Sequence, residues 1–348
     1  MTRRIVWIDS AKFIGIFLVI FNHFNIDYGQ DTFKLVIASF HMPLFFFLSG
    51  LTVKDQKITF KDFTRYIQSR FTRIMIPYYL WAFIFCGGVS LRNILLIGYA
   101  SNKSLASSGS NAVLWFLPCL FLSSIMVRLL LSFVSRVGEK KNLKMGILVG
   151  LVFANFIVGG VLGLLLPMFE NYDLPFSLNC AFIGNGFMLS GYLIKQLLQM
   201  HYSFEYSRYR LLSFITGIVS LVLLCILSFY NVKATDNFWG RVVMARSLFG
   251  NYILFICSGI IGSLSILMLT RVCFRKQNII CAIGAETLTI LCIHSLLISW
   301  VEKVLYKIAI NSWLMVFALI ILSAAVLAFS YVVAILIGKI VPNLAGKR

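Results

Sequence analysis

The sequence predicts an all-α protein, a polytopic helical bundle embedded in a membrane and formed as one domain over residues 1–348. Hydrophobic residues make up 60% of the 348-residue chain and charged residues only 12%, whereas a soluble domain is about half apolar and a quarter charged. Apolar runs of about 20 residues, the length that crosses a bilayer as a helix, recur along the chain. The connections between these runs are short, so we expect the helices and short loops to carry any chemistry.

Ten apolar runs are long enough to span a bilayer. They cover residues 8–27, 33–53, 74–95, 112–135, 145–166, 176–198, 211–230, 246–270, 279–301 and 312–339. Both termini and the loops on their side of these spans carry most of the Lys and Arg residues, while Lys12 and Arg128 fall inside spans. Because positively charged loops stay in the cytoplasm, we expect about ten transmembrane helices, both termini in the cytoplasm, and a multi-pass location in the cell (inner or cytoplasmic) membrane.

The charge and cysteine content exclude two other classes of site. The formal net charge of +19 would indicate nucleic-acid binding in a hydrophilic protein. Here the positive charge gathers in the predicted cytoplasmic loops, so we expect no nucleic-acid partner. The eight cysteines are scattered without a CxxC pair or histidines at metal-ligand spacing. We therefore expect no bound metal and no permanently bound cofactor.

The first predicted span carries three ionisable residues, Asp9, Lys12 and His23. Ionisable groups at membrane depth are costly unless they are paired or hydrated. At about 100° per residue, Lys12 and His23 fall on one helix face roughly 16 Å apart along the axis, and Asp9 is close enough to pair with Lys12. Two interpretations remain. The three residues form a polar stripe with a chemical role, or Asp9 and Lys12 snorkel to the interface and His23 caps the helix.

A second histidine, His41, lies in the next apolar run, SFHMPLFFFLSG, in the same outer half of the predicted membrane as His23. Pro43 and Gly50 in this run indicate a bent or tightly packed helix. An imidazole exchanges protons near neutral pH. Two histidines on adjoining helices therefore favour a site that holds a general base or an acyl-accepting imidazole.

Five further residues are candidates for ligand binding. Arg70 and Arg73, at i and i+3 before a span, present two guanidinium groups suited to phosphates, although positive-inside anchoring would also explain them. Trp115, at an outer helix end, is either an interfacial belt residue or a platform for a sugar ring. His294 falls in the outer half of the ninth span, where it either lines the site or hydrogen-bonds a neighbouring helix. Glu286 is only loosely on the same face as His294.

The segments RIVWIDSAKFIGIFLVIFNHF, SFHMPLFFFLSGL, RFTRIMIPYYLW and VLWFLPCLF resemble the acyltransferase 3 family of membrane O-acyltransferases. Within that family they are most similar to the branch labelled fucose 4-O-acetylase-like. The resemblance is strongest over residues 4–81 and 113–121. It implies about ten spans and the transfer of an acyl group, commonly acetyl from acetyl-CoA, to a sugar of a cell-surface or exported glycan. The implied partners are acetyl-CoA as co-substrate, a glycan or lipid-linked sugar acceptor, and the lipid bilayer.

The resemblance also assigns roles. His23 matches the essential histidine of the family, Asp9 its acidic residue, and Lys12 a basic residue that is more often Arg. Ser49 and Gly50 match a Ser-Gly pair that we interpret as packing. The candidate catalytic residues are His23, His41 and Asp9, the candidate donor-binding residues are Lys12, Arg70 and Arg73, and the candidate acceptor-binding residues are Trp115, His294 and Glu286. His23 either removes the acceptor's hydroxyl proton or carries the acyl group itself.

A different class of protein would also place His and Lys side chains within a membrane. In a multi-spanning transporter or glycan flippase, these groups would line a proton or substrate path. Such proteins typically contain inverted repeats with broken helices in matching halves. No such repeat is evident in this sequence, so the acyltransferase interpretation is preferred.

Overall fold

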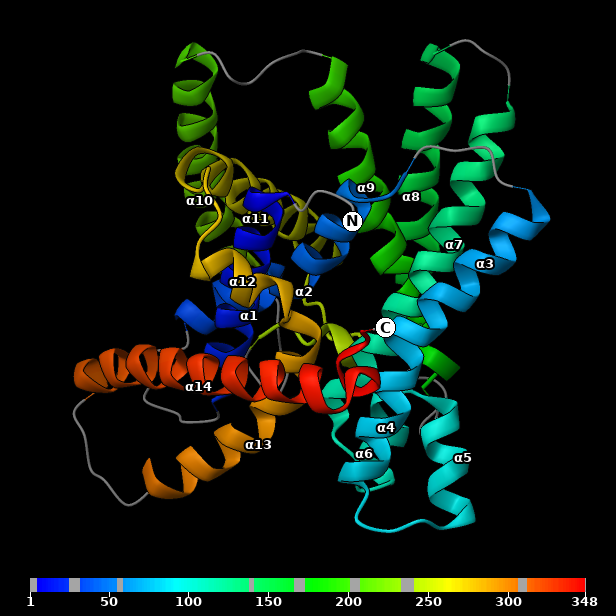
Figure 1. The fold of residues 1–348 in the computed structure, drawn as a ribbon. Helices are drawn as coiled ribbons and strands as arrows, with labels where there is room; N and C mark the ends of the chain where they lie inside the picture. The colour runs from blue at the N-terminus through cyan, green and yellow to red at the C-terminus, as the bar shows by residue number, and fades with distance from the viewer. Residues whose placement is uncertain are drawn as a thin grey trace. The chain divides into compact units, whose positions relative to one another are not determined.

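The computed structural model confirms an all-α polytopic membrane protein (Figure 1). It describes residues 5–24, 32–54, 59–137, 141–165, 173–200, 207–232, 241–305 and 312–347. These ranges contain no β-strand. The helices are α1 (Val6–His23), α2 (Thr32–Leu51), α3 (Phe60–Arg70), α4 (Ile76–Phe85), α5 (Leu91–Tyr99), α6 (Asn102–Ser107), α7 (Phe116–Arg136), α8 (Lys141–Leu165), α9 (Leu178–Met200), α10 (Ser207–Val232), α11 (Tyr252–Cys273), α12 (Ile279–Ala285), α13 (Thr287–Leu305) and α14 (Ser312–Ile340).

Seven helices of the described chain are long and apolar enough to cross a membrane. They are α1, α2, α7 with its preceding turn, α8, α10, α11 and α14. The bent pair α12 and α13 makes an eighth if it forms one span. The 23-residue helix α9, expected as a span, is not among them, and it includes the buried polar residues Asn179, Asn185 and Ser190. The expected number of ten spans therefore stays a prediction.

Two predicted spans are not continuous helices. The run 74–95 is interrupted because α4 ends at Phe85 and Gly87 takes a left-handed φ of 65°. The next helix, α5, then begins behind Ser90, whose side chain accepts a hydrogen bond from the backbone N–H of Asn93. The run 279–301 bends by 85° between α12 and α13. There the backbone of Glu286 leaves the helical region, with φ −100° and ψ 12°.

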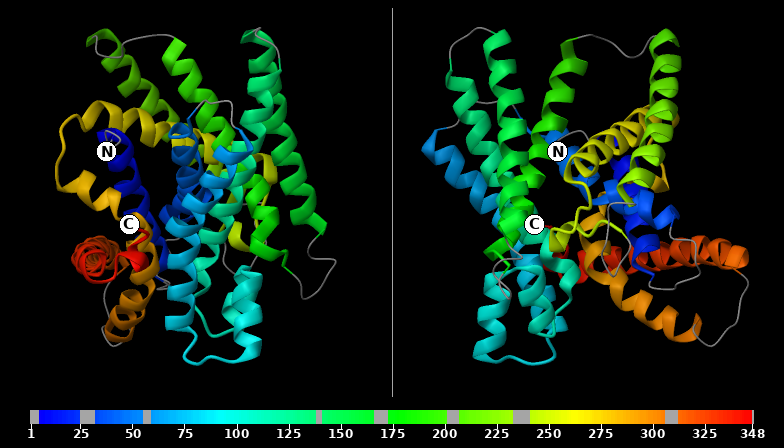
Figure 2. Two further views of the ribbon diagram at one scale, coloured as in Figure 1. Left: turned by 45° about the vertical axis from the view of Figure 1, so that its right-hand side comes forward. Right: turned by 180° about the vertical axis from the view of Figure 1, so that it is seen from behind.

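The chain divides into two compact units, each of which is described by itself. The first comprises Met1–Phe45, Ser203–Val243 and Leu248–Val341, and the second comprises Phe46–Tyr202, Met244–Ser247 and Pro342–Arg348. In the first unit α10 packs along α11, and α1 contacts α11, α12, α13 and α14. In the second unit α9 lies beside both α7 and α8 (Figure 2).

Within the second unit, the end of α2 and the middle of α9 approach backbone to backbone. A Cβ atom added at Gly50 would lie 1.9 Å from the carbonyl oxygen of Met188, and one added at Gly191 would lie 2.1 Å from that of Phe47. No side chain fits at either position, so glycine permits this approach. The packing interpretation of Gly50 is thus confirmed.

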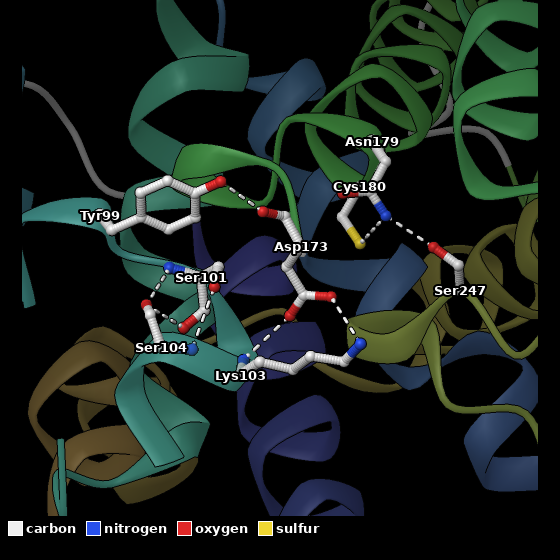
Figure 3. Close-up of polar contacts among 8 residues, drawn as sticks. All are labelled: Tyr99, Ser101, Lys103, Ser104, Asp173, Asn179, Cys180 and Ser247. Carbon is white, nitrogen blue, oxygen red and sulfur yellow. Dashed lines mark hydrogen bonds and ion pairs between the residues drawn. The ribbon is translucent and has the colours of Figure 1, made fainter. Parts of the chain in front are cut away.

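A polar network in the second unit holds the short helix α6 (Figure 3). The carboxylate of Asp173 accepts a hydrogen bond of 2.9 Å from the backbone N–H of Lys103, and its other oxygen lies 3.8 Å from the Lys103 ammonium. The Tyr99 hydroxyl donates to the Asp173 carbonyl at 2.6 Å. Ser101 and Ser104 form a capping box at the start of α6. Sequence-distant segments are therefore joined at this end of the unit.

The contact at Gly50 generates a stability prediction. Gly50→Ala should lower the melting temperature of the purified protein in detergent, because the added methyl group overlaps the Met188 backbone, at a cost of about 1–3 kcal/mol. Gly150→Ala is the matched control, since Gly150 lies within α8 with nothing within 4 Å of an added Cβ. That variant should keep or slightly raise the melting temperature. Equal melting temperatures for the two variants would contradict the close packing.

Candidate functional site

The predicted ion pair on α1 is present. Lys12 Nζ lies 3.1 Å from Asp9 Oδ1, with 32% of the Lys12 side chain and 10% of the Asp9 side chain exposed. The backbone at Asp9 is also a packing point, because a Cβ atom added at Gly284 of α12 would lie 1.8 Å from the Asp9 carbonyl oxygen. The short helix α12 thus packs directly on the part of α1 that carries the ion pair.

At the other end of α1, His23 meets a second imidazole. Nε2 of His294, on α13, lies 3.0 Å from Nδ1 of His23. His294 is fully buried, and His23, the last residue of α1, is partly exposed. Of the two interpretations of His294, the structure supports a hydrogen bond between helices, and the partner is the candidate catalytic histidine itself.

The backbone partners of His294 determine which nitrogens carry protons. Its Nδ1 lies 2.8 Å from the carbonyl oxygen of Leu291 and 3.2 Å from that of Ile290. Carbonyl oxygens only accept hydrogen bonds, so Nδ1 of His294 is the protonated nitrogen and, in the neutral ring, Nε2 is an acceptor. His23 must then donate from its own Nδ1. In the neutral pair, Nε2 of His23 is therefore left with a lone pair, as a base or nucleophile requires.

Two further polar groups surround His23. His41 and Arg241 are both close enough to His23 to interact with it electrostatically. The Nδ1 of buried His41 lies 2.8 Å from the carbonyl oxygen of Ile37, so its Nε2 is also the acceptor nitrogen. An Nη1 amino group of Arg241 donates to the backbone and side-chain oxygens of Asn22, at 3.2 and 3.3 Å. The first unit therefore brings three histidines and a guanidinium group together.

The placement of Glu286 differs from the sequence prediction. Glu286 and His294 were expected on one straight helix, about 80° apart around its axis. Instead Glu286 caps the C-terminal end of α12, and His294 lies on α13 beyond the 85° bend. The angle between two residues around a helix axis has no meaning across a break in the helix. Glu286 and His294 therefore do not share a helix face.

Arg70 and Arg73 lie in the second unit, at a change of helix type. The helix α3 begins with a capping box between Thr59 and Asp62, whose hydrogen bonds lower the pKa of the Asp62 carboxyl. It ends at Arg70, and Phe71–Met75 form a π-helical turn. The sequence placed Arg70 and Arg73 at i and i+3 of one α-helix, but Arg73 lies in the π-helical turn, so this α-helical spacing is absent.

The two arginines have different environments. Nε of Arg70 donates to the Tyr66 hydroxyl at 3.1 Å, whereas Arg73 is exposed. The backbone of Arg73 packs against the C-terminal turn, where a Cβ atom added at Gly346 would lie 2.4 Å from its carbonyl oxygen. Single π-helical turns are often found at functional sites, and this one begins directly after Arg70 and includes Arg73.

Trp115 also belongs to the second unit. It is the last residue of a 3₁₀ turn, Ala112–Trp115, that leads into α7, so the expected helix end is confirmed. Its side chain is only 6% exposed. An indole in an interfacial belt faces lipid headgroups. The burial of Trp115 among protein groups does not fit that interpretation.

Four polar residues near these candidates were missed from the sequence. They are Asn22, Tyr66, Arg128 and Arg241. Arg128 carried a signal, since it is a charged residue inside an apolar run. Arg241 lies on an irregular segment and was counted only as a loop charge, so the sequence held no indication of its approach to His23.

These observations define a multi-pass membrane protein whose helices carry a hydrogen-bonded histidine pair. A family model described as an acyltransferase domain, that of the acyltransferase 3 family, matches residues 5–335. The chain belongs to this family and is a membrane acyltransferase. Comparison with curated proteins and with solved structures finds no match for the chain. The alternative interpretation as a transporter or flippase is not favoured by the family match.

The proton assignment is testable by ¹⁵N NMR on protein labelled at histidine, at a pH where the rings are neutral. We expect His23, His41 and His294 all to carry the proton on Nδ1, because each hydrogen-bond arrangement requires it. His294→Asn and His41→Asn assign the signals by their loss. A His23 signal typical of an Nε2-protonated ring in the otherwise unchanged protein would contradict the assignment.

Proposed function

We propose that this acyltransferase moves an acetyl group from cytoplasmic acetyl-CoA to a hydroxyl group of a cell-surface or exported glycan sugar. The observation that carries the proposal is the His294–His23 hydrogen bond of 3.0 Å, which leaves Nε2 of His23 unprotonated in the neutral pair. An imidazole held in one tautomer needs no reorientation before it accepts a proton. The fully buried position of His294 keeps that orientation fixed.

The proposed reaction balances without a metal or redox group. Nε2 of His23 accepts the proton of the sugar hydroxyl while its oxygen attacks the thioester carbonyl carbon. The carbon–sulfur bond breaks, and the thiolate of CoA receives the proton from His23, giving the sugar ester and free CoA. In the two-step version, Nε2 of His23 attacks the thioester carbonyl carbon, the carbon–sulfur bond breaks and the thiolate of CoA leaves. The sugar oxygen then attacks the acetyl-imidazole, the bond between Nε2 and the acetyl carbon breaks, and the hydroxyl proton passes to the CoA thiolate.

The other candidate residues have supporting roles in this proposal. In the first unit Lys12, held by Asp9, is a candidate to bind an anionic group of the donor from the cytoplasmic side. In the second unit Arg70 and Arg73 are candidates for the same kind of contact. The acceptor would approach from the outer face. His41 and His294 would shape that end of the site. Trp115, in the second unit, stays a candidate acceptor contact. Glu286 lies two residues beyond Gly284, which packs on Asp9 at the donor end of α1, and is not proposed as an acceptor contact.

The first test is acetyl transfer by protein purified into nanodiscs. With acetyl-labelled acetyl-CoA and a glycan extract, the unmodified protein should release CoA and label the glycan. His23→Ala should reduce both by about 100- to 10,000-fold, since it removes the proton acceptor. His201→Ala, which removes an imidazole without a role in the proposal, is the matched control.

Donor binding and melting temperature are measured on the same samples. Retained acetyl-CoA binding and an unchanged melting temperature in His23→Ala assign the loss to chemistry. Full activity of folded His23→Ala would contradict the proposal. So would the absence of acetyl-CoA binding and turnover in the unmodified protein, and solute flux in proteoliposomes would then be the assay to perform.

A further inference from the structure

A buried arginine in the second unit is only partly hydrogen-bonded within the part of the chain that the structure describes. Arg128 lies within α7 and is only 7% exposed. One of its Nη groups donates to the backbone carbonyl of Lys54, while its Nε has no hydrogen-bond partner in the part of the chain that the structure describes. Among those residues it forms no salt bridge with a carboxylate. Burying an unpaired charge is costly, so this arrangement indicates an anion that the described residues do not supply.

A second guanidinium group shares the same aromatic ring. The Cζ atom of Arg128 lies 5.7 Å from the centroid of the Tyr66 ring, and that of Arg70 lies 5.2 Å from it. The Tyr66 hydroxyl donates to the Ser124 carbonyl at 3.3 Å and accepts from Nε of Arg70. Tyr66 therefore fixes Arg70 and stands next to both cations. Asp62 interacts with Arg128 electrostatically but is held by the hydrogen bonds that cap α3.

We infer that Arg70 and Arg128, positioned around Tyr66, form a subsite for a phosphate monoester, the 3′-phosphate of the acyl donor. The inference rests on the proposed function for the identity of the donor. Two guanidinium groups match a group with a charge of roughly −1.5 to −2, which is the charge of a phosphate monoester at pH 7. The 3′-phosphate is the only monoester in coenzyme A, since the other two phosphates form a diphosphate bridge in which each phosphorus bears a single negative charge. Guanidinium groups also bind phosphate oxygens in a bidentate manner.

The position of the subsite along the spans agrees with this ligand. Arg70 and Lys54 belong to the loop region that the charge distribution assigns to the cytoplasm. Acetyl-CoA is made on that side. Arg73, exposed within the π-helical turn, is not part of the subsite, so Arg70 and Arg73 make different contacts.

The test compares acetyl-CoA with acetyl-dephospho-CoA, which lacks only the 3′-phosphate. For the unmodified protein in nanodiscs, we expect the KM for acetyl-CoA to be about 10- to 100-fold lower than the KM for acetyl-dephospho-CoA. This difference corresponds to the loss of one or two charge-assisted hydrogen bonds. In Arg128→Met the two donors should have nearly equal KM values, with kcat little changed. Arg128→Lys, which keeps the positive charge but not the planar guanidinium group, should show an intermediate KM preference for acetyl-CoA. Arg136→Met, an exposed arginine of the same helix, is the matched control and should keep the preference.

A binding measurement separates this inference from the proposed function. Adenosine 3′,5′-bisphosphate should bind the unmodified protein more tightly than adenosine 5′-diphosphate, and Arg128→Met should abolish the difference. If the protein transfers acetyl groups but folded Arg128→Met keeps the full preference for the 3′-phosphate, the subsite is wrong and the proposed function stands. If the Arg128-dependent preference appears in binding while no acetyl transfer is found, the subsite stands and the proposed function fails. If Arg128→Met does not fold, the same two comparisons are made with Arg128→Lys: the KM for acetyl-CoA against that for acetyl-dephospho-CoA, and the affinity for adenosine 3′,5′-bisphosphate against that for adenosine 5′-diphosphate.

Discussion

The hydrogen bond between His294 and His23 is the interaction on which the candidate site depends. Polar groups within a membrane protein must find partners inside the protein, because the bilayer offers none. Each nitrogen in this pair is accounted for except one. The backbone of α13 accepts from His294, His294 accepts from His23, and Nε2 of His23 is left for a substrate. The break at Glu286 belongs to the same arrangement, since it allows α12 to pack on Asp9 while α13 brings His294 to the far end of α1.

Much of the fold and part of the site followed from the sequence, and the reasons are physical. Hydrophobic runs near 20 residues define spans without reference to tertiary contacts, so the helical membrane architecture was predictable. The Asp9–Lys12 pair was predictable because i, i+3 geometry is local to one helix. The proximity of His23 and His294 was not, because it depends on how two helices 271 residues apart in sequence pack together.

The errors occurred where backbone geometry departs from an ideal helix. Hydropathy averages over a window, so it joined α4 to α5 across Gly87 and α12 to α13 across Glu286. The spacing argument for Arg70 and Arg73 assumed an α-helix where the chain forms a π-helical turn. Arg128 shows the opposite case. Its charge inside an apolar run was visible in the sequence, but only the contacts around Tyr66 show that it is buried without a carboxylate partner among the described residues.

The backbone carbonyls that accept hydrogen bonds from His294 also prevent the histidine pair from passing protons on. A carbonyl oxygen of Leu291 or Ile290 accepts a hydrogen bond but does not take up and pass on a proton at any accessible pH. A proton that arrives at Nε2 of His23 therefore has no onward route through Nδ1 of His294. His23 and His294 consequently do not form a proton-transfer pathway across the membrane. A hydrogen-bonded histidine pair inside a membrane protein is thus not in itself a path for proton leakage.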